Sequence, residues 1–194
     1  MALEIGRRLV HASGAAVPAA YLLDTHVIET GVVTWSAVQV LAVAGLMVTV
    51  VLETARLYGG LEHAVYDRLT REYEQDSVAG YALYVVGATI TVFLFEPTIA
   101  VPALFMLTLG DPISGMLSSG GLRPIARPRV LVGMFAVCFL IAYPFVSPLA
   151  ALAGAFGATL ADGVKPILNG YVVDDNLTIP IIAAGAMWLA LNFV

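Results

Sequence analysis

Seven runs of hydrophobic residues follow one another along the chain, each separated from the next by a polar stretch. They lie near residues 9–23, 32–52, 78–95, 97–109, 130–147, 148–161 and 177–193. A bilayer core about 30 Å thick needs about 20 helical residues, and the first, fourth and sixth runs are shorter than that. Tilting, local thinning or partial insertion accommodates such runs. The pattern predicts an all-α integral membrane protein with about seven transmembrane helices in a single domain, residues 1–194.

The segment from Glu53 to Ser77 is too polar to span a membrane. Its apolar side chains Leu61, Val65, Leu69 and Tyr73 recur every four residues, with charged residues around them. This spacing is typical of one face of an amphipathic helix. We therefore predict a cytosolic interfacial helix between the second and third transmembrane helices.

Composition supports a membrane location. Hydrophobic residues make up 60% of the chain, charged residues 12%, and the mean hydropathy is +0.91, outside the range of soluble domains. Apolar sequence continues beyond the N-terminal run, so we interpret that run as a first span and not as a removed signal peptide. A lone cysteine, Cys138, excludes a disulfide framework. The net charge of −5 and the lack of a basic stripe argue against nucleic-acid binding.

Charged residues sort by side in this predicted bundle. If the N-terminus is cytoplasmic, all nine Lys and Arg residues fall on the cytoplasmic side, and the opposite connections carry only Asp24, Glu29 and Glu96 as charges. The positive-inside rule describes this asymmetry. We predict a multi-pass protein of a prokaryotic cell membrane, with its N-terminus and its active site on the cytosolic face.

Asp111 lies in the stretch "TLGDPISGMLSSGGLRP". One interpretation is an Asp N-cap with proline at the first helical position, followed by a flexible connector. The other is a site in which Asp111 binds a divalent cation, while glycine N–H groups and a guanidinium face phosphate oxygens. The phosphate-binding candidates there are Gly110, Gly120, Gly121 and Arg123.

Two adjacent aspartates, Asp174 and Asp175, precede the last apolar run in "YVVDDNLTIP". Capping by Asn176 or Thr178, with one aspartate complementing the helix dipole, explains a single acid. Two neighbouring carboxylates repel unless a cation lies between them. Since Mg²⁺ uses one or two protein carboxylates together with water and nucleotide phosphates, we predict Asp111, Asp174 and Asp175 as metal ligands.

Arg7 and His11 lie one helical turn apart and share a face. They either anchor the first helix at the interface or face phosphate. Glu53 and Arg56, three residues apart, are expected to form a local ion pair at the end of the second helix.

Five stretches together resemble the CTP-dependent polyprenol kinases, which include dolichol kinase, phytol kinase and CTP-dependent diacylglycerol kinases. These stretches are "RRLVH", "ETAR", "REYEQDSVAGYALYVVGA", "GDPISG" and "DDNLTIP", in the order of that family. The resemblance implies transfer of the γ-phosphate of CTP to the hydroxyl of a membrane polyprenol or related lipid alcohol, with Mg²⁺ as cofactor. By position it assigns Asp111, Asp162 and the Asp174–Asp175–Asn176 triplet to the site.

The chain departs from the family after its glycine loop. A lysine and a serine are usual there, where this chain has Arg129 and Val130. An arginine binds phosphate through a planar fork and keeps its charge, which a lysine can lose.

These observations give the expected division of roles. Lys165 and the arginines bind phosphate, and Asp162 or Asp175 accepts the proton of the alcohol. A CTP-dependent lipid cytidylyltransferase requires the same metal, nucleotide and lipid, so it is the alternative. An ion-coupled transporter is a weaker alternative, because the predicted spans carry no charge near their centres.

Overall fold

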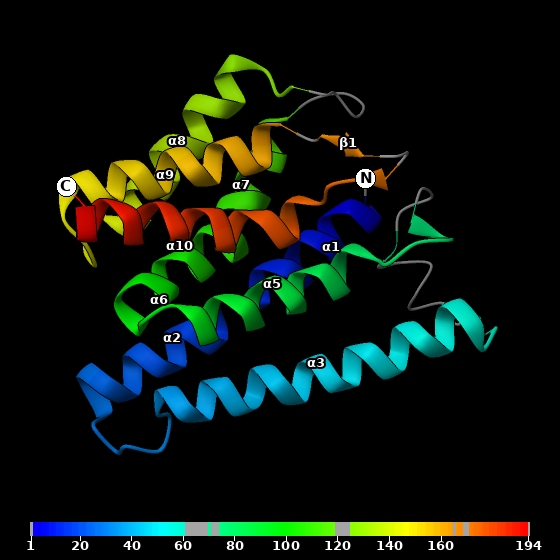
Figure 1. Cartoon of the computed structure of the whole chain (residues 1–194), viewed down its shortest axis with the longest axis horizontal. Coiled ribbons are helices and arrows are strands. Elements are labelled where there is room, and N and C mark those ends of the chain that lie inside the picture. The colour runs from blue at the N-terminus through cyan, green and yellow to red at the C-terminus, as the bar shows by residue number, and fades with distance from the viewer. Residues whose placement is uncertain are drawn as a thin grey trace.

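The computed structural model describes residues 2–60, 70, 74–118, 125–164, 166–168 and 171–193. The described part is predominantly helical (Figure 1). Its α- and π-helices are α1 (Ala2–Ser13), α2 (Ala16–Leu23), η1 (Asp24–Ile28), α3 (Trp35–Tyr58), α5 (Gly80–Leu94), α6 (Pro97–Phe105), η3 (Met106–Gly110), α7 (Asp111–Leu117), α8 (Pro128–Ala142), α9 (Pro148–Gly163) and α10 (Asp175–Phe193). Two short antiparallel strands, β1 (Ile167–Leu168) and β2 (Tyr171–Val172), precede α10.

Three helical segments of the described chain are long and apolar enough to cross a membrane. They are Trp35–Tyr58, Pro97–Leu117 and Asp175–Phe193, and α5 and α8 are shorter apolar helices. In the most apolar stretch of α3 only 11% of the residues are buried, against 67% in Pro97–Leu117. Helix α3 therefore lies at the periphery with an apolar outer surface, whereas the α6–η3–α7 segment runs through the interior.

The first apolar run was predicted to be one continuous helix, but the structure divides it into two. Helix α1 ends at Ser13, a turn follows at Gly14 and Ala15, and α2 begins at Ala16. Pro18 explains the break, because in an unbroken helix its ring would clash with the carbonyl of Gly14 and it has no N–H to donate. The N–H of Val17 instead donates to Gly14 O at 3.3 Å, a tighter turn.

The predicted interfacial helix over residues 53–77 can be compared with the structure only at its two ends. Residues 53–58 belong to α3, and residues 61–69 and 71–73 lie outside the described part. Glu74 has 3₁₀ geometry, residues 75–77 form a turn and a bend, and residues 78 and 79 lead into α5. That end of the prediction was wrong. The carbonyls of Glu74, Gln75 and Ser77 accept hydrogen bonds from Arg56, so a side chain holds this segment in its turn.

Helices α5, α8 and α10 pack around the central α6–η3–α7 segment, and α9 packs against α8 and α10. Small residues allow the close contacts: a methyl group at Gly154 of α9 would lie 2.5 Å from Met187 Cγ of α10. Likewise, a methyl group at Gly87 of α5 would lie 2.9 Å from the carbonyl oxygen of Asn176. The first turn of α10 is therefore pressed directly against α5.

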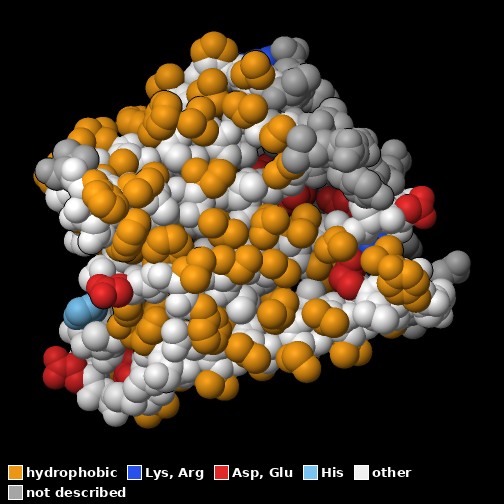
Figure 2. All heavy atoms as spheres, viewed as in Figure 1, with side chains coloured by type: hydrophobic (Ala, Val, Ile, Leu, Met, Phe, Trp, Pro, Cys, Tyr) orange, Lys and Arg blue, Asp and Glu red, His pale blue; other side chains and the backbone are white. Residues whose placement is uncertain are grey.

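Polar and apolar surfaces separate along the bundle. The end of α3, the start of α5, the end of α9 and the start of α10 point toward the same end as the N-terminus (Figure 1). Figure 2 shows hydrophobic side chains over most of the visible face, and acidic side chains in a recess toward that end. Acidic side chains are also visible at the opposite end of this face, so the recess is what distinguishes the end near the N-terminus (Figure 2).

Candidate functional site

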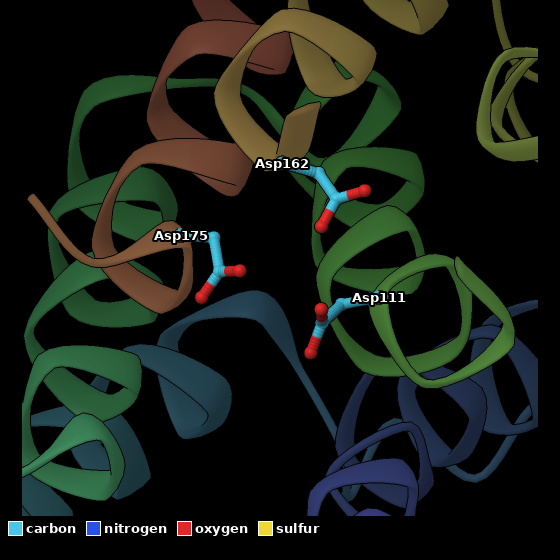
Figure 3. A group of neighbouring side chains, drawn as sticks. All are labelled: Asp111, Asp162 and Asp175. Carbon is cyan, nitrogen blue, oxygen red and sulfur yellow. The ribbon is translucent and has the colours of Figure 1, made fainter. Parts of the chain in front are cut away.

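Three carboxylates from three helices meet at this end of the bundle. Asp111 begins α7, Asp162 lies in the last turn of α9, and Asp175 begins α10. One carboxylate oxygen from each lies within 4.8 Å of those of the other two, and Figure 3 shows the side chains directed toward a shared space. Asp162 and Asp175 are 8% and 2% exposed. The structure thus brings together the predicted metal ligands Asp111 and Asp175 with Asp162, which the resemblance assigns to the site.

Asp111 owes its position to a π-helical turn. Helix η3 inserts one wide turn between α6 and α7, and the N–H of Asp111 donates to Met106 O, five residues earlier. Such turns rotate the following residues relative to a regular helix and are frequent at functional sites. Gly110 is buried, and a methyl group there would lie 3.2 Å from Cys138 Sγ and 3.3 Å from Met134 Cε. Close packing against α8 therefore explains this glycine, which we had predicted to bind nucleotide.

Asp162 is oriented by Ser114. The Ser114 hydroxyl, on a side chain that is 2% exposed, donates to Asp162 Oδ2 at 2.5 Å. A hydrogen bond to an ionised acceptor is stronger than one between neutral groups. Sequence reasoning missed Ser114, although its position three residues after Asp111 puts both on one helical face.

The two adjacent aspartates have different surroundings. Asp174 is the N-cap of α10, and its Oδ1 accepts from the N–H of Asn176 at 2.9 Å. The group of three carboxylates found among the described residues includes Asp175 and not Asp174. Capping, which we had considered for Asn176 or Thr178, is thus performed by Asp174. Asn176 Oδ1 is buried without a hydrogen-bond partner in the described part of the chain.

A second polar cluster adjoins the triplet from the side of α5. A methyl group at Gly80 would lie 3.0 Å from Asn176 Nδ2, 3.4 Å from Glu74 Oε1 and 3.6 Å from Asp174 Oδ2. Glu74 is 3% exposed. Sequence reasoning did not select Glu74, because five acidic residues fall between positions 62 and 76 and nothing in their spacing distinguishes it.

His11 reaches the site from α1. Its Nε2 lies 2.8 Å from Leu107 O and 3.6 Å from Asp111 Oδ2, and its ring packs edge-on against Tyr84 with centroids 4.9 Å apart. A carbonyl only accepts, so Nε2 carries a proton directed at η3. The structure therefore places His11 beside the carboxylate of Asp111, and it connects α1 to the helical turn that holds that residue.

The remaining predicted residues are only partly described. Gly120, Gly121, Arg123 and Lys165 lie outside the described part of the chain, as does the side chain of Arg7. Arg129 is exposed in the first turn of α8. The phosphate-binding residues expected from the sequence therefore stay predictions.

The short hairpin before α10 was not predicted. Its strands flank Asn169 and Gly170 in "ILNGYVV", and an Asn-Gly pair between apolar residues is a strong hairpin signal. This pattern is the feature of the sequence from which β1 and β2 could have been predicted.

The cluster of three carboxylates, Asp111, Asp162 and Asp175, suits a hard divalent cation. Mg²⁺ holds oxygen ligands at about 2.1 Å, so opposite ligands lie about 4.2 Å apart and adjacent ones about 3.0 Å apart. A pair of oxygens at the 4.8 Å limit would close by about 0.6 Å to become opposite ligands, or by about 1.8 Å to become adjacent ones. Three carboxylates this close repel one another, and a divalent cation offsets that repulsion.

No family model, curated protein or solved structure matches the chain.

Proposed function

We propose that this protein is a Mg²⁺-dependent lipid kinase that transfers the γ-phosphate of CTP to the hydroxyl of a membrane polyprenol or related lipid alcohol. The observation that carries the proposal is the convergence of Asp111, Asp162 and Asp175 within 4.8 Å. These are three of the four acids that the resemblance to CTP-dependent polyprenol kinases assigns to the site, and 51 and 13 positions separate them along the chain.

The location of the cluster supports a reaction between a soluble and a lipid reactant. The carboxylates lie toward one end of the bundle, near the ends of α9 and α10, while the helices expose many large hydrophobic side chains. A nucleotide can approach from water at this depth, and an alcohol on a lipid chain can approach sideways between helices. We propose a multi-pass protein whose site faces the cytosol, as the distribution of Arg and Lys predicts.

Mg²⁺ would be held by Asp111 and Asp175, close to the charge of Asp162, and it would neutralise charge on the phosphate oxygens of the nucleotide. Asp175 lies at the start of α10, where the helix dipole complements a negative charge. His11 holds Asp111 toward the cluster from the side of α1.

In the reaction, the oxygen of the lipid alcohol attacks the γ-phosphorus of CTP. A new oxygen–phosphorus bond forms, the bond from the γ-phosphorus to the oxygen bridging to the β-phosphate breaks, and CDP leaves with that oxygen. We assign acceptance of the alcohol's proton to Asp162, because the last turn of α9 is where the helix dipole disfavours a negative charge. Ser114 keeps one oxygen of Asp162 occupied and so orients the other.

A label-transfer experiment tests the proposal. The full-length protein in lipid vesicles is given CTP labelled at either the α- or the γ-phosphate, Mg²⁺ and a panel of lipid alcohols that includes dolichol, phytol and diacylglycerol. A kinase moves only the γ-label to lipid and releases CDP. Transfer of the α-label to a phosphorylated lipid, with release of pyrophosphate, would instead identify a cytidylyltransferase.

Two variants control this assay. Asp111→Asn should abolish transfer, whereas Glu96→Gln makes the same chemical change at an exposed residue that precedes α6 and should leave transfer unchanged. Absence of label from lipid with every alcohol, or wild-type activity in Asp111→Asn, contradicts the proposal.

A further inference from the structure

A buried ion pair at the end of α3 is not used by the proposed chemistry. The guanidinium of Arg56 donates to both carboxylate oxygens of Glu53, from Nε at 2.8 Å and from Nη2 at 2.8 Å. The two side chains are only 8% and 9% exposed. A charged pair buried at the end of an apolar helix is costly, which makes a specific role a reasonable hypothesis.

The pair binds a turn that carries no regular secondary structure of its own. Arg56 donates to the carbonyl oxygens of Glu74, Gln75 and Ser77 at 3.3, 3.0 and 2.5 Å. Three backbone groups of residues 74–77 thus depend on one guanidinium, whose planar shape serves several acceptors at once.

Glu53 attaches the same turn to α5. Its Oε2 accepts from the N–H of Ala79 at 3.1 Å, and its Oε1 accepts from the Tyr81 hydroxyl at 2.5 Å. The pair therefore joins three segments, namely the end of α3, the turn at residues 74–79 and the start of α5.

This junction lies against the residues that flank Asp175. Glu74 Oε1, Asp174 Oδ2 and Asn176 Nδ2 all lie within 3.6 Å of the position that a methyl group would take at Gly80. Asp174 in turn accepts from the N–H of Asn176, across Asp175. The contacts of the turn thus bear on the start of α10, where Asp175 enters the carboxylate cluster.

We propose that Glu53 and Arg56 are positioning residues for the metal site: they hold Glu74 in place next to Gly80, where Asp174 and Asn176 also converge, and this arrangement sets the direction of Asp175. The inference rests on the proposed function only in taking the carboxylate cluster as a site for a divalent cation. Neither residue touches the nucleotide or the lipid in this proposal.

Metal affinity separates positioning from a general loss of stability. We would titrate the full-length protein in detergent with Mn²⁺ and follow free Mn²⁺ by electron paramagnetic resonance, with no nucleotide or lipid present. Arg56→Gln and Glu53→Gln should weaken Mn²⁺ binding by about tenfold, as expected for residues that orient metal ligands indirectly. In the transfer assay, the Mg²⁺ concentration for half-maximal rate should rise by a similar factor.

The same pair of helices provides the matched control. Gln39 of α3 donates from Nε2 to Val92 O of α5 at 3.1 Å, near the other end of the α3–α5 contact. Gln39→Leu removes a side-chain hydrogen bond between these helices, so it should lower the melting temperature while leaving Mn²⁺ affinity within about twofold of wild type.

A second variant tests the inference without breaking the ion pair. Gly80→Ala adds a methyl group where Glu74, Asp174 and Asn176 converge, and it should also weaken Mn²⁺ binding. Gly185→Ala is its control, because a methyl group there meets nothing within 4 Å. Gly80→Ala decides the matter if the Arg56 variant does not fold.

The outcomes distinguish the inference from the proposed function. Mn²⁺ affinity that stays at the wild-type value in the Arg56, Glu53 and Gly80 variants, or that falls equally in Gln39→Leu, overturns the inference alone. If wild-type protein binds Mn²⁺ but transfers no phosphate from CTP, the kinase assignment is overturned. The Mn²⁺ affinities of the variants then still decide the inference. Wild-type protein that binds no Mn²⁺ overturns both.

Discussion

Replacing Asp162 by asparagine removes one negative charge from the carboxylate cluster while keeping its size and an acceptor for the Ser114 hydroxyl. We expect the change to have opposite effects on stability in the absence and in the presence of a divalent cation. Without the cation, the charge is a source of repulsion. With the cation, it contributes to binding.

The magnitude follows from the geometry. The carboxylate oxygens lie within 4.8 Å of one another, and two unit charges at that limit repel by about 3.5 kcal/mol at an effective dielectric constant of 20. Asp162 has two such neighbours, and its place in the last turn of α9 adds about 0.3 to 1 kcal/mol of unfavourable helix-dipole energy. Solvent near Asp111, which is 23% exposed, screens the repulsion. The two pairs sum to about 7 kcal/mol before screening, and with most of that sum screened by solvent we expect a net stabilisation of about 1 to 2 kcal/mol in chelator.

Thermal unfolding of the purified protein in detergent measures both effects. In chelator, the melting temperature of Asp162→Asn should exceed that of wild type by about 2 to 8 °C. At a Mg²⁺ concentration 100 times the dissociation constant, wild type should gain about 2.7 kcal/mol and the variant much less, so the order reverses. Glu96→Gln, an equal change of charge at an exposed residue before α6, should not respond in this way. An Asp162→Asn protein that melts below wild type in chelator and gains as much from Mg²⁺ would refute the reasoning.

Three further predictions concern single contacts. Asp24→Asn should lower the melting temperature near neutral pH and have no effect in strong acid. The Thr30 hydroxyl and the N–H groups of Val33, Thr30 and Val32 hold the pKa of Asp24 below its usual 3.8. The stabilisation by this carboxylate is therefore complete above that value and is lost as pH falls through the lowered pKa. Equal pH profiles for the two proteins would count against this. Gly87→Ala should cost about 1 to 3 kcal/mol of unfolding free energy, because its methyl group would lie 2.9 to 3.1 Å from backbone atoms of Asn176 and Leu177. Gly185→Ala, whose methyl group meets nothing within 4 Å, should stabilise the protein. Urea titration compares the two variants, and equal unfolding midpoints would contradict the packing of α5 against α10. Ser114→Ala removes the hydroxyl that donates to Asp162 at 2.5 Å. In steady-state kinetics it should reduce the maximal rate of transfer more than it changes the half-saturating CTP concentration. An unchanged maximal rate would exclude an orienting role for Ser114.

The sequence by itself determined the class of molecule and most of its helical segments. A mean hydropathy of +0.91 and long apolar runs are typical of membrane proteins, because they provide too few polar residues to cover the surface of a soluble domain. Local signals in the sequence also mark several helix ends. Thr34 and Ser147, for example, cap α3 and α9 by accepting from the N–H groups of Ala37 and Ala150. Such features depend on neighbours within a few residues, so they can be read without knowing the fold.

The membership of the carboxylate cluster was decided by tertiary structure. Asp174 and Asp175 are adjacent and chemically identical, yet one caps α10 and the other joins Asp111 and Asp162. Successive helical residues point about 100° apart, so the packing of α10 against α5 decides which carboxylate enters the cluster. The partners Ser114 and His11, and the turn that Arg56 holds against the start of α5, likewise depend on contacts between segments 18 to 96 positions apart. Local pattern carries no information on such contacts, because they arise only when the helices pack.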